Sequence, residues 1–367
     1  MNEYTNKIIN YAFRVTPLTE EEKSFVKNNY TPENANDLKE TLKTKKVRPV
    51  VGKMMVSLGV DEVYWKSEYE YFLNRNKAVI SEIDSIFSEL RKNGITRIIA
   101  YENFGALLSS DTDVALYSSG DADLFADVSS KDEITKIMQS LGYTPTLDFH
   151  DERKIMTEYL KKDGIIRVNI DWIILRRMMF PIKISLEGVL NWSQLRKYKT
   201  TNINLPSKEA LLYLCLLRIA VHGFSRSPDV RLYIDIQNCV CVDPDWDKVI
   251  AWAKRDEVLT KVVAVAYIAH YLNGVAVPEF VLKLVEKDKY AQQIINICYD
   301  ANNRTLKYDP AGMDLMRVEA ASDNRSLSGE FFAMLFPSKK WLKEFYQKPG
   351  DGCARKYFNY YKRLIGR

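Results

Sequence analysis

Two carboxylates lie close together in residues 119–125, which read Ser-Gly-Asp-Ala-Asp-Leu-Phe. Because residues two apart in a strand point to the same face, Asp121 and Asp123 are expected to project together while the apolar residues between and after them face a core. Two adjacent carboxylates repel each other unless a cation lies between them. Hard oxygen ligands of this kind suit Mg²⁺, which commonly bridges to substrate phosphates. The pair therefore indicates metal-assisted phosphoryl or nucleotidyl transfer.

A third carboxylate follows in residues 165–175, whose alternating apolar pattern predicts a second strand. The polar face of this strand carries Arg167, Asn169 and Asp171, and Asp171 is the only carboxylate in the run. If the two strands are neighbours, Asp171 can converge with the aspartate pair on one or two metal ions. A solvated strand face would give the same Asp-x-Asp pattern, so the short motif alone does not decide between these interpretations.

The elements that position these residues follow from periodicity. Residues 79–90 have helical spacing and Gly94 can end that helix, after which residues 95–100 read as a strand. A loop is expected at Gly105. A capping-box pattern at 130–133 is expected to begin a helix that runs to Gly142. This order predicts an α+β fold with a small mixed sheet.

The flanking regions read as helical. Residues 1–75 form a helical N-terminal region with a basic loop at 41–48, and strand signals fade after Leu186. A buried helix is expected near 211–221, further helices near 246–252 and 260–272, and a loop or break at 302–323. The predicted division is a helical N-terminal region (1–75), an α+β core (76–185), a helical lobe (186–300), and a loop with a C-terminal helical tail (301–367).

Composition and the motifs that the chain lacks limit the possible partners, reaction classes and location of the protein. The net charge of +5 fits an anionic substrate, but the basic residues are interleaved with acids and do not require nucleic acid as a partner. No Gly-rich phosphate loop or nucleophile triad is evident. The five cysteines have neither zinc spacing nor an even count, which favours a reducing cytoplasm. We expect no signal peptide and no membrane partner, because no basic leader or long apolar run occurs.

Several short stretches of the sequence, taken in their order along the chain, form a pattern that resembles a known family. They are residues 94–100, 104–107, 120–125, 168–172, 217–224, 232–236 and 335–342. From about Tyr69 to the C-terminus, this series resembles the DNA polymerase β-type nucleotidyltransferase superfamily. Within that superfamily, the chain is similar to a bacterial branch described only as uncharacterised nucleotidyltransferases.

The resemblance implies a transferase that moves a nucleoside monophosphate from an NTP such as ATP to an acceptor hydroxyl or phosphate, with Mg²⁺ or Mn²⁺ as cofactor. Asp121 and Asp123 would hold the metal, and Asp171 would complete the site and help to activate the acceptor oxygen. The nucleotide is expected to approach the backbone near three small residues, Gly105, Ser119 and Gly120. The acceptor is expected to be a small molecule rather than a nucleic acid.

The chain also departs from the family pattern. Phe104 stands where the family commonly has Lys, and Tyr117 stands where it commonly has Arg. Aligning on Trp172 places Asn169, not Asp171, at the position of the third acid. A catalytically inactive relative that binds a nucleotide or a partner is therefore an alternative.

Five further residues are weaker candidates. Arg176 and Arg177 can clamp phosphates or simply end a solvated strand. His222 can contact phosphate or lie at the negative end of a helix. Arg231 and Asp235 can contact the acceptor or a phosphate, or can form an ordinary i,i+4 pair.

The basic and aromatic residues at 356–367 are open to two interpretations. They can stack nucleic-acid bases, as in a toxin-like transferase that acts on tRNA or protein. They can equally form an amphipathic helix that docks on the body of the protein, which we favour.

Overall fold

The computed structural model describes residues 2–110, 112–147, 156–172, 193–198, 201–224, 231–307, 313–339, 342 and 352–365. Five helices come first: α1 (Glu3–Phe13), α2 (Glu20–Asn28), α3 (Pro32–Lys45), α4 (Arg48–Ser57) and α5 (Glu62–Lys92). The predicted basic loop at 41–48 is wrong, because most of that stretch belongs to α3. Only Lys46 and Val47 separate α3 from α4, and Lys46 ends α3 with a left-handed φ of 54°.

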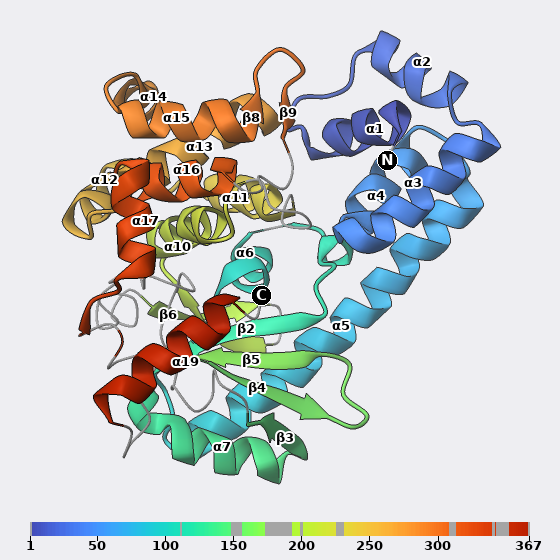
Figure 1. The fold of residues 1–367 in the computed structure, drawn as a ribbon. Helices are drawn as coiled ribbons and strands as arrows, with labels where there is room; N and C mark the ends of the chain where they lie inside the picture. Colours follow the sequence, from blue (N-terminus) through green and yellow to red (C-terminus); the bar gives the residue numbers. More distant parts are fainter. Residues whose placement is uncertain are drawn as a thin grey trace.

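The helix α5 runs along one side of the molecule and joins the N-terminal helices to the sheet (Figure 1). It begins at Glu62, so the predicted boundary at residue 75 falls inside a continuous helix. Its second half buries residues such as Val79, Ile83 and Phe87, as the helical spacing predicted. Gly94 follows with a φ of 83°, which confirms the predicted left-handed stop.

The α+β prediction is confirmed by a five-stranded mixed sheet with the strand order β1-β2-β5-β4-β3. Its strands are β1 (Ile98–Ala100), β2 (Asp121–Ala126), β3 (Tyr143–Thr146), β4 (Met156–Lys161) and β5 (Arg167–Asp171). The two acid-bearing strands are neighbours, since β2 pairs with β5 in parallel and Asp123 lies opposite Asn169. This register places Asp121, Asp123, Asn169 and Asp171 on one face of the sheet.

The loop expected at Gly105 is wrong, because Gly105 lies inside helix α6 (Glu102–Ser109). A Cβ atom on Gly105 would lie 2.8 Å from the carbonyl oxygen of Ala100 and 3.3 Å from Cδ1 of Leu211 in helix α10 (Lys208–Val221). The glycine is thus needed for α6 to pack between β1 and α10. Its predicted contact with a nucleotide stays a prediction.

Other local differences have simple causes. Helix α7 (Lys131–Ser140) lacks the predicted cap from Ser130, because Asp127 caps a preceding 3-10 turn, η2 (Val128–Ser130), instead. A hairpin of β6 (Ser193–Tyr198) and β7 (Thr201–Pro206) was not predicted, and β7 lies against β1 and α5.

The loop predicted at 302–323 contains helix α16 (Met313–Ser322), which is rich in strong helix formers.

The predicted helical lobe is confirmed and continues beyond residue 300 (Figure 1). Its remaining elements are α11 (Leu232–Val240), α12 (Trp246–Arg255), α13 (Leu259–Asn273), α14 (Glu279–Glu286), α15 (Lys289–Cys298), β8 (Tyr299–Asp300), β9 (Thr305–Leu306) and α17 (Leu327–Leu335). The last described helix, α19 (Cys353–Ile365), lies in the predicted C-terminal tail. Within the described chain, no helix combines the length and apolar character needed to cross a membrane.

Two hydrophobic cores hold these elements together. One core lies under the sheet, between the strands and helices α5, α6 and α7. The other joins the N-terminal helices to the helical lobe, so that Ile8 and Trp65 share a core with residues of α10 and α13. The N-terminal region is therefore an integral part of the body that surrounds the sheet.

Substitution of Gly105 tests this packing. Gly105→Ala should lower the free energy of unfolding by about 1–3 kcal/mol, because the added methyl group meets a strand carbonyl that cannot move away. Gly120→Ala is the matched control, since nothing lies within 4 Å of a Cβ atom there. Urea unfolding of both variants measures the difference. Equal stabilities would contradict the packing role assigned to Gly105.

Candidate active site

The aspartate pair is held together by an amide from the neighbouring strand. Nδ2 of Asn169 donates to Oδ2 of Asp121 at 3.2 Å and to Oδ1 of Asp123 at 3.0 Å. Asp123 is 5% exposed and Asn169 is 8% exposed, so this arrangement is largely removed from water. The other amide atom, Oδ1 of Asn169, is buried without a hydrogen-bond partner among the described residues.

The loop before β2 is fixed from helix α5. Nδ2 of Asn76 donates to the carbonyl oxygens of Val114 and Tyr117, both at 2.7 Å. A guanidinium nitrogen of Arg75 donates to the carbonyl oxygen of Ser119 at 2.6 Å. These bonds set the direction in which the chain enters β2, and therefore the position of the first aspartate.

Asp121 itself is oriented by two hydroxyl groups. The Ser119 hydroxyl donates to the Asp121 carboxylate, and the Tyr117 hydroxyl donates to the Asp121 carbonyl oxygen. Ser119 is fully buried, so its hydroxyl serves the carboxylate and not solvent. The predicted nucleotide-binding residue Ser119 thus lies at the site, directly against the first aspartate.

Asp171 lies on the same face as the pair but two residues beyond Asn169 along β5. In the β-sheet register it is opposite Phe125, and its carboxylate accepts a hydrogen bond from the hydroxyl of the buried Tyr101. Asn169 is therefore the immediate neighbour of both aspartates. Within the described part of the chain, no three Asp, Glu, His or Cys side chains gather closely enough to hold a metal ion alone.

Burial and the nearby negative charge of Asp121 favour the protonated form of Asp123. Burial, followed by the negative charge of Asp121, raises the pKa of Asp123 to about 6, and Arg218 only partly opposes this. Asp121 behaves in the opposite way. Burial disfavours its charge, but the Ser119 hydrogen bond and nearby cations outweigh that effect and lower the pKa of Asp121. These cations belong to Arg231, Lys46 and Arg167.

These features fit a hard divalent cation. Two carboxylates lie side by side, an amide donor bridges them in place of a positive charge, and one buried amide oxygen has no partner. Rotation of the Asn169 amide would exchange its nitrogen for this oxygen. The resulting set of Asp121, Asp123 and Asn169 oxygens is of the kind that Mg²⁺ prefers.

A second charged pair lies beside the aspartates and was not predicted. Oε2 of Glu102 in α6 forms an ion pair with Nε of Arg218 in α10 at 3.1 Å. Glu102 is 3% exposed and adopts a left-handed φ of 54°, which is uncommon for this residue type. Its Oε1 has no hydrogen-bond partner among the described residues. Arg218 lies within the stretch 217–224 that carries the family resemblance.

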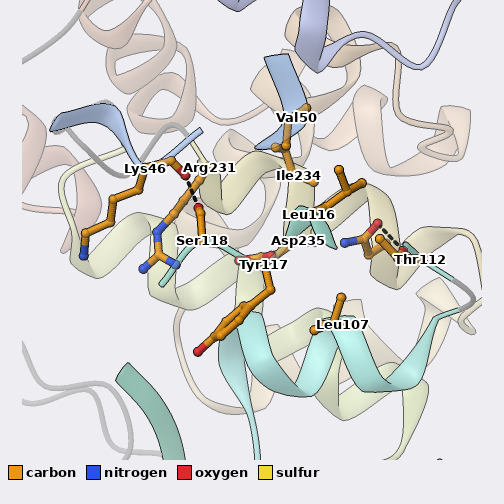
Figure 2. A pocket seen from close by; sticks show the side chains of 11 residues that line it. Lys46, Val50, Leu107, Thr112, Leu116, Tyr117, Ser118, Arg231, Ile234 and Asp235 are labelled. Atoms are coloured by element: carbon orange, nitrogen blue, oxygen red, sulfur yellow. Dashed lines mark hydrogen bonds between the residues drawn. The ribbon is translucent and has the colours of Figure 1, made fainter. Parts of the chain in front are cut away.

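A small cavity adjoins Tyr117 and is lined by polar groups from three regions of the chain (Figure 2). Lys46 follows the end of α3, and Thr112 and Ser118 come from the loop before β2. Arg231 precedes α11 and Asp235 lies in its first turn. The cavity has a volume of about 30 Å³, which holds water molecules or one end of a ligand but not a nucleobase.

Asp235 is 8% exposed in this cavity, and its Oδ2 has no hydrogen-bond partner among the described residues. Burial raises the pKa of Asp235 to about 7, against the attraction of Arg231. The structure therefore brings Arg231 and Asp235 to one cavity, and their predicted contact with a ligand stays a prediction. No ion pair joins their described side chains.

The other predicted site residues are spread more widely. Gly120 is exposed at the start of β2, and its carbonyl oxygen accepts a hydrogen bond from the Arg167 amide at 3.2 Å. His222 caps the C-terminus of α10. Arg176 and Arg177 lie outside the described residues. Lys46 was not singled out by sequence reasoning, although the basic stretch that contains it was noted.

The buried carboxyl of Asp235 predicts a pH-dependent stability. The folded state holds its proton up to about pH 7 whereas the unfolded chain releases it near 3.8, so this group costs stability as the pH rises through that window. Asp235→Asn should therefore gain stability relative to the natural chain between pH 4 and 7, by about 4 kcal/mol at most, since each pKa unit corresponds to about 1.4 kcal/mol. Urea unfolding at pH 4, 5.5 and 8 measures this gain. A difference that does not change with pH would contradict a buried neutral carboxyl.

Comparison with known proteins gives one match. The family described as "uncharacterised nucleotidyltransferase" matches residues 31–274, which include the N-terminal helices from α3 onward, the sheet and the helical lobe as far as α13. No curated protein and no solved structure matches the chain. Because the match covers most of the sequence and includes both aspartates of β2, the chain belongs to this uncharacterised nucleotidyltransferase family.

Proposed function

We propose that the protein transfers a nucleoside monophosphate from an NTP, such as ATP, to a hydroxyl or phosphate group of an acceptor, in the manner of the DNA polymerase β-type superfamily. One observation carries the proposal. In a member of a nucleotidyltransferase family, the buried Asp123 and the half-buried Asp121 lie on one strand, and both accept hydrogen bonds from one amide of the adjacent parallel strand. A pair of this kind is costly unless it serves a cation.

In this proposal Asp121 and Asp123 hold Mg²⁺ or Mn²⁺. When bound, the ion offsets the negative charge that develops on the phosphates during transfer. The Ser119 hydroxyl keeps the Asp121 carboxylate oriented, and the low pKa of Asp121 keeps it charged at neutral pH. The exposed backbone at Gly120 allows close approach of the nucleotide.

Asp171 is proposed to accept the proton of the acceptor group. It lies on the same sheet face as the pair, and the Tyr101 hydroxyl holds its carboxylate in one orientation. Whether Asp171 or Asn169 also serves the metal depends on side-chain rearrangement when the ion binds. Asn169 lies closer to the two aspartates, whereas Asp171 carries a negative charge that can attract the ion.

We propose a small-molecule acceptor and a cytoplasmic location. The mild net charge and the dispersed basic residues favour a small acceptor over nucleic acid. The alternative is a non-catalytic protein that binds a nucleotide or a partner, and the occurrence of Asn169 at the third acid position favours it. An activity assay and a binding assay together separate these functions.

Removal of the first aspartate tests the catalytic role. Asp121→Asn should abolish release of pyrophosphate from an NTP panel assayed with Mg²⁺ and a mixture of hydroxyl-bearing acceptors, with a loss of at least a hundredfold, because a charge that balances the metal disappears. The exposed Asp132→Asn variant on α7 is the control and should retain full activity. Normal turnover by Asp121→Asn would show that this carboxylate does not hold a catalytic metal.

Thermal stability tests the coupling of metal and nucleotide. Mg²⁺ and a non-hydrolysable NTP should together raise the Tm by more than the sum of their separate effects, because a metal that bridges protein and phosphate makes each ligand strengthen the other. Asp123→Ala should remove this synergy. The non-catalytic alternative predicts synergy without transfer, whereas the absence of any response to NTP with Mg²⁺ or Mn²⁺ would contradict nucleotide binding altogether.

Two further variants identify the third metal ligand. If Asn169 ligates through its oxygen, Asn169→Asp should tighten Mg²⁺ binding about tenfold or more and lower stability in the absence of metal, since a third carboxylate joins the pair. If Asp171 is the ligand, Asp171→Asn should weaken Mg²⁺ binding by a similar factor. Calorimetric titration of Mg²⁺ into both variants distinguishes the two roles. Unchanged affinity in both would place the ion elsewhere.

A further inference from the structure

Phe104 and Tyr117, the two positions at which the family resemblance implies cations, carry no charge here, and both are buried. Phe104 is fully buried within α6, and Tyr117 is 4% exposed and packs against the Phe104 ring at a centroid distance of 5.5 Å. Neither can attract a phosphate chain by charge. A nucleotide bound at Asp121 and Asp123 would thus need cations from other elements.

Two cations from distant parts of the sequence fill this need. Lys46 ends α3 and Arg231 precedes α11, yet both line the cavity beside Tyr117. Figure 2 shows their side chains extending next to each other, toward the side on which the Tyr117 hydroxyl lies. Among the described residues, neither charged group forms an ion pair or hydrogen bond, and Nε of Arg231 is buried without a partner.

Hydrogen bonds connect the end of α3 to the strand that carries the first aspartate. The Ser118 hydroxyl donates to the carbonyl oxygen of Lys46, and the Tyr117 hydroxyl donates to the carbonyl oxygen of Asp121. The loop before β2 therefore joins Lys46 to the aspartate pair.

We propose that Lys46 and Arg231 form the binding site for the phosphate chain of the nucleotide, replacing the cations that are missing at Phe104 and Tyr117. This proposal rests on the proposed nucleotidyl transfer and names the phosphate-binding part of the same site. A phosphate chain that reaches the metal at Asp121 would lie between the ion and these two side chains. The N-terminal helices then contribute a binding residue and are not only packed against the lobe.

The chemistry of the two side chains suits phosphate. The guanidinium group of Arg231 can bind two phosphate oxygens through parallel hydrogen bonds, and the Lys46 ammonium group adds a compact positive charge. Both are already partly removed from water, so their attraction for an anion is screened less than on an open surface. The cavity is too small for a base, so the base and the sugar of a bound nucleotide would lie outside it.

Inorganic tripolyphosphate is the direct probe, because it carries the phosphate chain without base or sugar. Its dissociation constant, measured calorimetrically with Mg²⁺ present, should rise at least tenfold in Lys46→Gln and in Arg231→Gln. Lys46→Arg keeps the charge and should remain within about threefold of the natural chain, which separates loss of charge from loss of folding. Lys43→Gln on the exposed face of α3 and Arg317→Gln on α16 are matched controls and should bind normally.

The same titrations separate this proposal from the proposed function. If the natural chain binds a non-hydrolysable NTP with Mg²⁺ synergy but Lys46→Gln and Arg231→Gln bind tripolyphosphate as tightly as the controls, the phosphate site is overturned while nucleotide binding stands. If tripolyphosphate does not bind the natural chain at all, the site is likewise overturned. A third outcome is that Lys46→Gln and Arg231→Gln weaken tripolyphosphate binding while Asp123→Ala leaves the synergy between Mg²⁺ and NTP unchanged. That outcome would support the phosphate site and contradict the metal role of the aspartate pair.

Discussion

The repulsion between Asp121 and Asp123 is the constraint on which the candidate site depends. Two carboxylates on one strand face, one of them 5% exposed, are tolerated because Asn169 donates to both from the adjacent strand. That arrangement requires β2 and β5 to pair in parallel, in the register that sets Asp123 opposite Asn169. A shift of one residue would turn either side chain to the other face and leave the pair unsupported.

The rest of the structure maintains this register and balances its charge. Arg75 and Asn76 of α5 fix the loop that leads into β2, and Gly105 lets α6 pack against the end of β1. Cations reach the site from elements that enclose it, namely Lys46 from the N-terminal helices and Arg218 and Arg231 from the lobe. A shared core joins those helices to the lobe, so the charges that surround the aspartates belong to one packed body.

Alternation and helical spacing were enough to predict the α+β class, the two acid-bearing strands and the main helices of the lobe, whereas the pairing of those strands was only a condition of the site hypothesis. These signals arise from burial of one face, which is a local property of the sequence. Gly105 was misplaced because its role is to let α6 pack closely between Ala100 and Leu211, and the contact with Leu211 of α10 joins segments far apart in the sequence that no local pattern encodes. The hairpin of β6 and β7 was missed for a similar reason, since β7 is positioned by β1 and α5.

For the candidate site, too, the sequence indicated some residues and did not indicate others. Asp121 and Asp123 were evident from their spacing, whereas the contribution of Lys46 depends on a turn about 70 residues earlier in the chain that folds back onto Ser118. The most direct test of the whole account is a crystal structure with Mn²⁺ and a non-hydrolysable NTP, in which anomalous scattering locates the metal. We predict an anomalous peak between the carboxylates of Asp121 and Asp123, with a phosphate oxygen bound to it. Metal and nucleotide bound away from this pair, with the Asn169 amide still bridging the two carboxylates, would contradict the account.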